Sequence, residues 1–377
     1  MIYLDYAANT PVDKEVLDLF YDISLNHYGN PNSNHKLGFD ANNLIDEATN
    51  NIANNLGVLP EEIIYTSGAT EANNLAIKGI AERYKSFGKH IIISSLEHNS
   101  IMASATYLQE SGYDIEILPI KHDGLVDIEA LKNMIRDDTI LVSVCLIDSE
   151  IGLVQPINDI GALLKQYPNT YFHTDASQAV GKVKTDFTNV DLITIAPHKF
   201  YGLNGTGILI KKKGVSLRPI IHGGKSTTIY RSGSPVTANI VATAKALELA
   251  LNNLEDRYNY VDKLNQRIIN HLKKYKNIHI NNTVNSISYT INFSVKGVKS
   301  LDIAKSLEDK DVYVSTKTSC CPIETPSKLV YALTKDKQLA STSIRVSLSH
   351  LTTESEVDKF LSAIDEILKE LKENGKI

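Results

Sequence analysis

Buried strands alternate with helices through the first two thirds of this chain, and this alternation limits its fold more than any other feature. Apolar runs bounded by turn residues predict strands over 90–95, 114–120, 140–147, 170–176, 192–198 and 207–212. Helical patterns lie between most of them, for example over 71–86, 98–111, 127–136 and 157–166. Such alternation is typical of an α/β fold with a largely parallel sheet. Sheets of this kind bind ligands at the carboxyl ends of their strands.

The pattern changes after about residue 235. Two long helical stretches, 235–253 and 255–275, precede "SISYTINFSV", "VYVST" and "SIRVSLS", which predict a small antiparallel or mixed sheet. A last helix carries an apolar stripe at period 3.6, which predicts packing against a core and not a partner site. The stripe consists of Val357, Phe360, Leu361, Ile364, Ile367, Leu368 and Leu371. We therefore expect one large domain and one smaller C-terminal domain in close contact.

Composition and charge exclude several classes of protein. The 377 residues are 42% hydrophobic and 22% charged, as in ordinary soluble globular proteins. With a net charge of -5 and no long Lys/Arg block, no direct nucleic-acid contact is expected. The start, "MIYLDYAANT", lacks the apolar core of a signal peptide, and no apolar run is long enough to span a bilayer. We expect a cytoplasmic protein without membrane contact.

A small-residue turn with hydroxyl side chains follows one predicted strand. In "YTSGATEANNLAI" the chain passes from a strand end into a helix, with Ser67 and Thr70 at the junction. Backbone N–H groups, these hydroxyls and the helix dipole are suited to hold a phosphate. Ser and Thr are also preferred helix caps, and for this stretch taken alone the cap is the better interpretation.

Two further strand ends carry an acid and a lysine. "HTDASQAVGK" places Asp175 and Gln178 after one strand, and "APHKFYGLNGTG" places His198 and Lys199 after another. Such an acid caps a turn, pairs with a lysine or contacts a ligand nitrogen, while a buried lysine is costly unless it forms, for example, a Schiff base. The glycines match neither the dinucleotide nor the P-loop pattern. A phosphate cradle, an Asp and a Lys together are what pyridoxal 5′-phosphate (PLP) requires.

Two of the chain's three cysteines are adjacent, Cys320 and Cys321 in "STKTSCCPIETP". A disulfide between neighbours is strained, and three cysteines form no disulfide framework in a reducing compartment. No further ligands at metal spacing flank them, so no metal site is expected. A reactive thiol, or two inert loop cysteines, are the alternatives that remain.

At this point the sequence resembles the cysteine desulfurases of the NifS/IscS kind, within the class V aminotransferase family of PLP-dependent fold-type I enzymes. The matching motifs occur in order over nearly the whole chain: "YLDYAANTPV", "GNPNSNHKLG", "YTSGATEANNLAI", "LEHNSI", "SEIGLVQPI", "HTDASQAVGK", "HKFYG", "RSGSP", "TSCC" and "IRVSLSHLTTESEVD". The resemblance implies a large domain over 14–255 with a mostly parallel seven-stranded sheet. It implies a smaller α+β domain, formed by 1–13 and 256–377, that carries the cysteine loop. It also implies a homodimer with sites built across the interface.

The resemblance implies roles around the PLP ring. Lys199 would form the Schiff base and move the Cα proton. Asp175 would pair with the pyridine nitrogen, which keeps it protonated, and Gln178 would bond the ring O3′. His98, in "LEHNSI", would stack on the ring and assist proton transfer, although a lone His is usually structural. Ser149 would lie near O3′ and the substrate.

The remaining roles concern the phosphate and the substrate. Thr70 with the neighbouring Ala69 and His198 would bind the phosphate, and Ser234 would reach it from the other subunit. Arg345, in "IRVSLS", would hold the substrate carboxylate through a charge-assisted pair of hydrogen bonds. A surface ion pair is the alternative for Arg345.

Cys320 aligns with the family's catalytic cysteine, and this answers the question raised by the two adjacent thiols. The enzyme would take sulfur from L-cysteine onto Cys320 as a persulfide and release L-alanine. Lys317 and His98 are candidates to favour the thiolate. Cys321 is either a second relay thiol or a bystander. The acceptor would be another protein, such as an iron–sulfur scaffold or a tRNA-thiolating enzyme.

The chain departs from the family pattern at several positions. The family's "NNE" is "DSE" here, so that Ser149 stands for an asparagine. Ala196 replaces a phosphate-binding serine, Lys317 replaces a glycine, and the stretch 223–233 differs from the usual loop. These changes leave the fold and PLP in place but keep two alternatives open. One is another class V enzyme, such as a selenocysteine lyase or an aminotransferase; the other is a non-catalytic sulfur-transfer scaffold.

Overall fold

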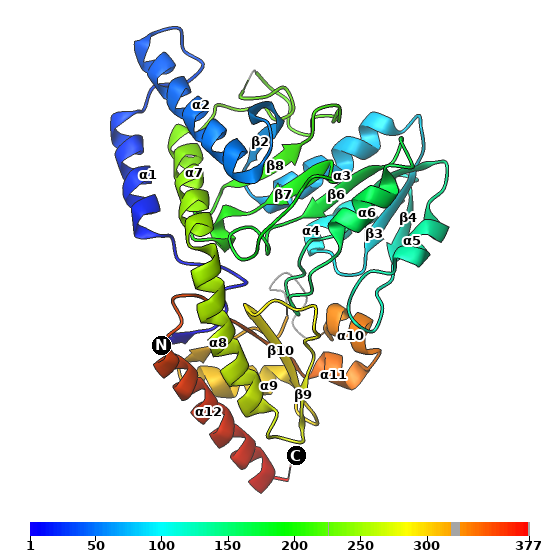
Figure 1. Cartoon of the computed structure of the whole chain (residues 1–377), viewed down its shortest axis with the longest axis vertical. Helices are drawn as coiled ribbons and strands as arrows, with labels where there is room; N and C mark the ends of the chain where they lie inside the picture. The colour runs from blue at the N-terminus through cyan, green and yellow to red at the C-terminus, as the bar shows by residue number, and fades with distance from the viewer. Residues whose placement is uncertain (225, 318–324, 376–377) are drawn as a thin grey trace.

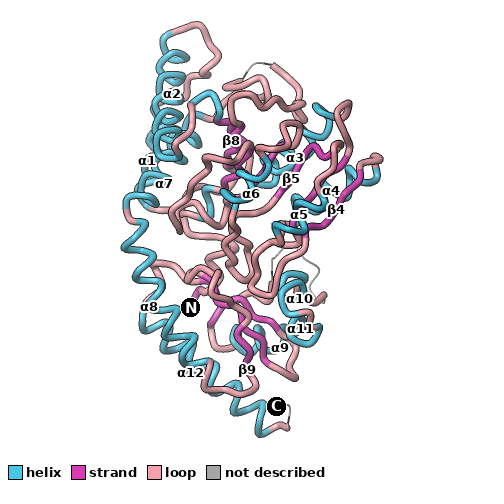
Figure 2. Tube along the Cα trace, turned by 45° about the vertical axis from the view of Figure 1, so that its right-hand side comes forward, coloured by secondary structure: helices cyan, strands magenta, loops and turns pink. Residues whose placement is uncertain are grey.

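The computed structural model describes residues 1–224, 226–317 and 325–375, so Cys320 and Cys321 lie outside the described residues. Figure 1 shows a large sheet flanked by helices in the upper part and a smaller sheet with its own helices below it. Helices α7 (Thr237–Asn252) and α8 (Leu254–Leu272) join the two parts along one side. The turned view in Figure 2 shows these two helices following each other along the same edge.

The large sheet has seven strands in the order β2-β8-β7-β6-β5-β3-β4. They are β2 (Ile63–Thr66), β3 (His90–Ser94), β4 (Asp114–Leu118), β5 (Thr139–Ser143), β6 (Tyr171–Asp175), β7 (Leu192–Ile195) and β8 (Gly207–Lys211). Neighbouring strands are parallel except at β8, which is antiparallel to both β2 and β7. Within the described residues, the predicted α/β fold with a mostly parallel sheet is confirmed. Strand β5 ends earlier than predicted because Cys145–Ile147 leave the sheet toward a cavity.

Helices cover both faces of this sheet. They are α1 (Lys14–Asn26), α2 (Lys36–Leu56), α3 (Ala69–Tyr84), α4 (Asn99–Glu110), α5 (Ile128–Met134) and α6 (Ile157–Leu164), together with α7. In a strand successive side chains point to opposite faces. Ile91 and Ile93 of β3 accordingly pack with α3 and α4, whereas Ile92 belongs to the core that contains side chains of α2, α6 and α7. Burial on both faces explains why these strands are continuous apolar runs.

The smaller part is an antiparallel sheet in the order β12-β10-β9, backed by helices. Its elements are β9 (Ile278–Ile280), β10 (Thr290–Val295), α9 (Ser300–Glu308), α10 (Lys328–Thr334), α11 (Lys337–Ser341), β12 (Ser343–Ser347) and α12 (Glu354–Glu373). The apolar stripe of α12 is buried from Val357 to Leu368 and half-buried at Leu371. The prediction that this stripe packs against a core is confirmed.

The run "VYVST" pairs with two different segments. It contributes β11 (Val312–Tyr313), which pairs in parallel with β1 (Ile2–Tyr3), and its Ser315 forms an antiparallel bridge to Arg345 of β12. The mixed pairing predicted for this region is therefore present, although β1 was not predicted as a partner. The partner strand of β11 lies at the N-terminal end of the chain, so no local sequence pattern indicates this pairing. The N-terminal segment makes further contacts here, since the backbone N–H of Ala7 donates to Oγ of Ser347 (2.9 Å).

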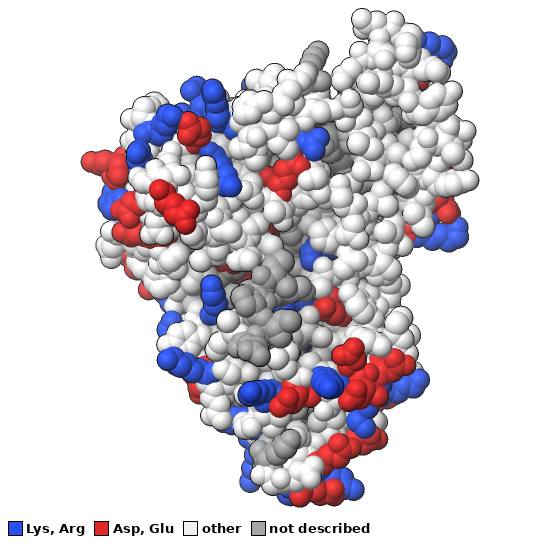
Figure 3. All heavy atoms as spheres, turned by 180° about the vertical axis from the view of Figure 1, so that it is seen from behind, with Lys and Arg blue, Asp and Glu red and all other residues white. Residues whose placement is uncertain are grey.

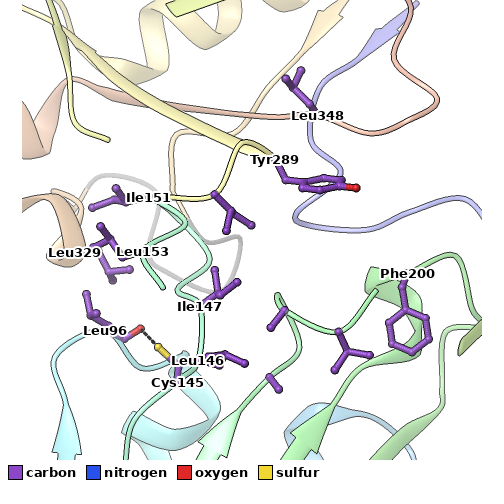
Figure 4. Close-up of a cluster of buried hydrophobic side chains, with 14 of the residues drawn as sticks. Leu96, Cys145, Leu146, Ile147, Ile151, Leu153, Phe200, Tyr289, Leu329 and Leu348 are labelled. Carbon is purple, nitrogen blue, oxygen red and sulfur yellow. Dashed lines mark hydrogen bonds between the residues drawn. The ribbon is translucent and has the colours of Figure 1, made fainter. Parts of the chain in front are cut away.

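Apolar side chains connect the two parts below the strand ends of the large sheet. Figure 4 shows Ile147, Ile151 and Leu153 extending from the segment after β5 toward Tyr289 and Leu329 of the lower part. All five are buried, so the smaller part has little freedom to shift without exposing apolar surface. In the part of the chain that the structure describes, none of the helices has the length and apolar character needed to cross a bilayer.

Candidate active site

A cavity of about 360 Å³ lies at the carboxyl ends of β3, β5, β6 and β7, between the large sheet and β12. Its size is that of a small-molecule site, and its position is the one expected for a parallel sheet. It brings together these predicted site residues: Ala69, Thr70, His98, Ser149, Asp175, Gln178, His198, Lys199 and Arg345. Ser234 lines a neighbouring cavity instead, beside Arg231. Cys320 lies outside the described residues.

Asp175 ends β6 and borders the cavity with 7% of its surface exposed. Its Oδ2 accepts a hydrogen bond from Asn73 Nδ2 (2.8 Å), and its Oδ1 accepts one from the backbone N–H of Ser177 (2.9 Å). A carboxylate has about four acceptor positions. These two bonds fix the carboxylate and leave acceptor capacity for an N–H group of a ligand.

Asn73 and Ser100 link Asp175 to His98. Asn73 Nδ2 also donates to Ser100 Oγ (2.9 Å), and the backbone N–H of Ser100 donates to His98 Nδ1 (3.2 Å). Because Nδ1 accepts this bond, a neutral His98 carries its proton on Nε2. Burial lowers the pKa of His98, with Asp175 acting in the opposite direction and Lys199 lowering it further. The ring is therefore neutral at pH 7.

Lys199 ends a short 3-10 helix, η2 (Pro197–Lys199), directly after β7. Its Nζ donates to the backbone carbonyls of Ala7 (2.7 Å) and Ala8 (2.6 Å), which also border the cavity. Burial lowers the pKa of the neighbouring His198 to about 4, and nearby lysines act in the same direction. His198 is thus a neutral ring with one N–H to donate.

Gln178 is held on both sides of its amide. Its Nε2 donates to the carbonyl of Ala7 (2.9 Å), and its Oε1 accepts from Lys182 Nζ (2.6 Å). Gln178 is 8% exposed and Lys182 is 7% exposed. Burial lowers the pKa of Lys182 to about 7, with further contributions from Lys199 and Arg345.

The N-terminus of α3 forms one wall of the cavity. The first N–H groups of a helix lack partners within it and attract anions. Glu71 in this turn accepts from the N–H of Ser67 (2.8 Å) and pairs with Arg231 (2.9 Å). Burial alone would raise the pKa of Glu71, but hydrogen bonds from Arg231 and Ser67 lower it. A side chain at Gly207 would approach the backbone of Gly68 to 2.5 Å, so glycine lets β8 lie against this turn.

Arg345 enters the cavity from β12 and is 1% exposed. One terminal nitrogen pairs with Asp5 Oδ1 (2.6 Å), and the other donates to the backbone carbonyl of Ser149 (2.8 Å). These contacts fix the guanidinium at the edge of the cavity. The surface ion pair considered as the alternative for Arg345 is therefore wrong, because the guanidinium is buried.

The turn after β5 is held together by a buried acid, Asp148. Asp148 accepts hydrogen bonds from the backbone N–H groups of Glu150 (2.8 Å), Ile151 (2.8 Å) and Leu153 (2.7 Å). Burial raises its pKa to about 6, although these three bonds oppose the shift. The Asp of "DSE" thus shapes the turn that places Ser149 beside Arg345.

A second buried acid, Glu97, lies next to the cavity. Its Oε1 accepts from Ser94 Oγ (2.7 Å) and from the backbone N–H of Cys145 (2.7 Å). Burial raises the pKa of Glu97 to about 8. The thiol of Cys145 borders the cavity and donates to the carbonyl of Leu96 (3.6 Å), as Figure 4 shows. Because burial also raises the pKa of this thiol, Cys145 is unsuited to act as a nucleophile.

One group of described residues has the composition of a metal site, at the opposite end of the sheet. Ligand atoms of His90, Asp114 and Glu116 lie within 4.8 Å of one another. Arg136 already pairs with Asp114 (2.7 Å) and lies 3.9 Å from Glu116. A guanidinium in this position neutralises the two acids, so the group is better described as an ion-pair network.

The residues around the cavity fit PLP. Asp175 is available for a pyridine N–H, Lys199 for the aldehyde, and the start of α3 with His198 for the phosphate. Within the described residues, two buried polar atoms that belong to cavity-lining residues have no hydrogen-bond partner, Ser177 Oγ and Arg345 Nε. Such atoms are costly unless a ligand or water bonds them. Ser177, Asn73 and Ser100 were not predicted as site residues.

Comparisons with known proteins agree with this geometry. Residues 2–360 match the family Aminotransferase class-V. The chain is 37% identical to "Cysteine desulfurase IscS" of Dictyoglomus turgidum, over 98% of this chain and 95% of that protein. It is also 37% identical to "Cysteine desulfurase, mitochondrial" of Arabidopsis thaliana, over 99% of this chain and 83% of that protein.

Solved structures extend the comparison. A "NIFS-LIKE PROTEIN" superimposes with a TM-score of 0.92 at 33% identity and covers 98% of this chain and 99% of its own. "SspA in complex with cysteine" superimposes with a TM-score of 0.82 at 30% identity, over 94% of this chain and 100% of its own. The fold and the cavity thus define a PLP-dependent enzyme of the class V aminotransferase family. Within that family, the chain belongs with the cysteine desulfurases of the NifS/IscS kind.

Proposed function

We propose that this enzyme removes sulfur from L-cysteine, producing L-alanine and a persulfide on Cys320. The observation that carries the proposal is one cavity that unites Lys199, Asp175, His98 and Arg345. The reaction balances without an external oxidant or reductant. The C–S bond of the substrate breaks and an S–S bond to Cys320 forms. The carbon keeps the electron pair of the broken bond and takes up a proton, which balances the proton that the Cys320 thiol loses.

PLP, when bound, supplies an electron sink conjugated to the amino group of the substrate. Lys199 holds the cofactor and afterwards moves the proton at the substrate Cα. Asp175 keeps the pyridine nitrogen protonated, and Gln178 donates to the ring oxygen O3′. The N–H groups around Ala69 and Thr70, together with neutral His198, bind the phosphate.

Arg345 binds the substrate carboxylate, for which its unpaired Nε–H is suited. Ser149 supports this site through its carbonyl, which accepts from Arg345. His98 would lie against the cofactor ring, and its Nε2 would exchange a proton there. Its lowered pKa keeps the ring neutral and therefore able to accept a proton at pH 7.

Cys320 accepts the sulfur as the nucleophile. The described residues next to its segment are linked, since Lys317 Nζ donates to the carbonyl (2.5 Å) and Oγ1 (2.8 Å) of Thr325. After the segment, Ser327 Oγ donates to Glu150 Oε2 (2.5 Å). Ser315 exchanges backbone hydrogen bonds with Arg345, and Glu150 follows Ser149, both neighbours being cavity-lining residues. These contacts support a proposal that the segment starts and ends near the cavity.

The working unit is a homodimer in which Ser234 reaches the partner's phosphate. Ser234 is exposed in the single chain. Large apolar side chains are exposed close to Ser234 in the sequence, at Ile229 and Val236, and on α1 and α2, at Leu17, Tyr21, Leu25, Leu37 and Phe39. Exposed apolar side chains in such number are typical of an interface.

The chain divides into 14–255 and a smaller domain of 1–13 with 256–377. The pairing of β1 with β11 supports this division. The sulfur acceptor is a protein, either an iron–sulfur scaffold or a tRNA-thiolating enzyme, and the compartment is the cytoplasm. Figure 3 shows Lys/Arg and Asp/Glu side chains interspersed on the face that it presents, which supports a protein acceptor over direct nucleic-acid contact.

The test is alanine released from L-cysteine, with a thiol reductant, by wild type and by Cys320→Ser and Cys321→Ser variants. We expect wild type and Cys321→Ser to turn over and Cys320→Ser to be inactive. Full activity of Cys320→Ser would indicate a different class V reaction. Failure of the wild type to release alanine while it binds PLP would mean that the substrate is another amino acid, and failure to bind PLP would favour a scaffold.

A further inference from the structure

Lys182 is a buried lysine whose hydrogen bond goes to an amide oxygen. It is 7% exposed, and no carboxylate in the described part of the chain lies within ion-pair distance of its Nζ. Its hydrogen bond goes to Gln178 Oε1 (2.6 Å). The charged groups that most affect it are cations, Lys199 and Arg345. A buried ammonium without a counter-charge lowers the stability of the fold. Packing therefore does not explain why a lysine occupies this position.

The contacts of Gln178 settle which way its amide faces. The carbonyl of Ala7 is an acceptor only, so the atom of Gln178 that contacts it at 2.9 Å is Nε2. The ammonium of Lys182 is a donor only, so the atom that contacts it is Oε1. Two independent neighbours therefore impose one orientation. In this orientation the group left to face the cavity is the second N–H of Nε2.

The Ala7 carbonyl extends this arrangement to Lys199. It accepts from Gln178 Nε2 and from Lys199 Nζ (2.7 Å) at the same time. A hydrogen-bonded path therefore runs from Lys182 through Gln178 and Ala7 to the lysine that holds the cofactor. Loss of Lys182 would leave Gln178 Oε1 without its donor, so that the Ala7 carbonyl alone would hold the amide.

We propose that Lys182 is a positioning residue, which fixes Gln178 with a donor toward the cavity and adds positive charge behind it, so that the site favours the anionic form of the PLP ring oxygen. The inference rests on the proposed placement of PLP against Gln178. It also explains the missing carboxylate, because the anion that compensates Lys182 is the cofactor itself.

Replacing Lys182 should affect the stability of the PLP-free protein and its affinity for PLP differently. Replacing a buried charge by an apolar side chain of similar length is often neutral or stabilising. Lys182→Met should therefore leave the melting temperature of the PLP-free protein unchanged or higher. The same change should weaken PLP binding roughly tenfold, the size expected for one charge-assisted hydrogen bond, and should alter the visible absorption band of bound PLP. A purely structural lysine would give the opposite pattern, with lower stability and an unchanged band.

Lys184→Met is the matched control, since Lys184 is exposed two positions along the chain and should change neither quantity. Lys182→Gln keeps a donor for Gln178 without the charge, so we expect a PLP affinity between those of wild type and Lys182→Met, with the visible band altered as in Lys182→Met. If Lys182→Met does not fold, this variant decides the question: a loss of affinity greater than tenfold would contradict the positioning role.

A double substitution tests whether the effect passes through Gln178. In a Gln178→Leu background there is no amide to orient, so adding Lys182→Met should change PLP affinity less than about twofold. An equal loss in both backgrounds would overturn the proposal. So would wild-type affinity and spectrum in Lys182→Met while the wild type binds PLP. Failure of the wild type to bind PLP would overturn the proposed function and this inference together.

Discussion

Asp175 and Asp148 are two buried acids that border one cavity, yet they differ in what holds them. Asp148 accepts three backbone N–H groups from the five residues that follow it. Asp175 accepts one backbone N–H and one side-chain amide from a distant helix. The acid satisfied by its own turn is structural. The acid oriented by a distant side chain, with acceptor capacity left, is available to a ligand.

The largest effect is expected for Asp175→Asn. A neutral amide cannot keep the pyridine nitrogen protonated, so alanine release should fall roughly 10²-fold or more, the usual scale for losing a positioned proton partner. PLP should still bind. Turnover and PLP content measured on one preparation check this prediction. Turnover near the wild-type rate would mean that Asp175 does not act on the pyridine nitrogen.

Asp148→Ala should affect folding. The substitution leaves three buried N–H groups without their acceptor, so the free energy of unfolding should fall by about 2 kcal/mol or more. Urea denaturation of the PLP-free protein measures it. The visible band of bound PLP should remain, and loss of that band in a folded variant would place Asp148 among the cofactor ligands.

Glu97→Gln tests how a third buried acid next to the cavity affects the pH dependence of stability. The pKa of Glu97 is raised to about 8 in the folded protein from 4.5, so the folded state retains a proton that the unfolded state loses. This contribution to stability is fully present below about 4.5 and declines as the pH rises through 8. Relative to wild type, Glu97→Gln should gain about 1–2 kcal/mol of unfolding free energy between pH 6 and pH 8. A constant difference over that range would mean that Glu97 is ionised in the folded protein.

The smallest effect is expected for Asn73→Ala. Asp175 keeps its bond from Ser177 but loses the amide that orients Oδ2, so kcat should fall about fivefold, as for one neutral hydrogen bond. KM for L-cysteine should change little, because Arg345 holds the carboxylate. Asn74 is half-buried on the same helix and donates to the carbonyl of Thr70 (2.9 Å) and not to Asp175. It provides the control variant Asn74→Ala, and equal losses in both variants would contradict a positioning role for Asn73.

The sequence predicted the parallel sheet and most of the cavity for a shared physical reason. Continuous apolar runs identify strands buried on both faces, and Asp175 and Lys199 follow such runs directly. Contacts between distant segments leave no such local signal. Asn73 reaches Asp175 across 102 positions, and Arg345 reaches Asp5 across 340. The pairing of β11 with β1 left no local signal for the same reason.

The role proposed for Lys182 could not be predicted from the sequence either. It lies in the recognised stretch "HTDASQAVGK", but a lysine four residues after Gln178 gives no sign of being buried until the surrounding core is known. The carbonyl of Ser149 and the turn around Asp148 also depend on the folded backbone. Residue types therefore predicted most of the side chains that line the cavity, whereas the structure was needed to find the groups that orient them.

The most direct test of the account is where sulfur goes. Wild-type holoenzyme is mixed with L-cysteine without reductant, and its peptides are analysed by mass spectrometry for an added sulfur atom. We expect the addition on the peptide that contains Cys320, its loss in Cys320→Ser but not in Cys321→Ser, and none on buried Cys145. Sulfur on Cys145, or no added sulfur in a PLP-loaded wild type, would contradict the mechanism.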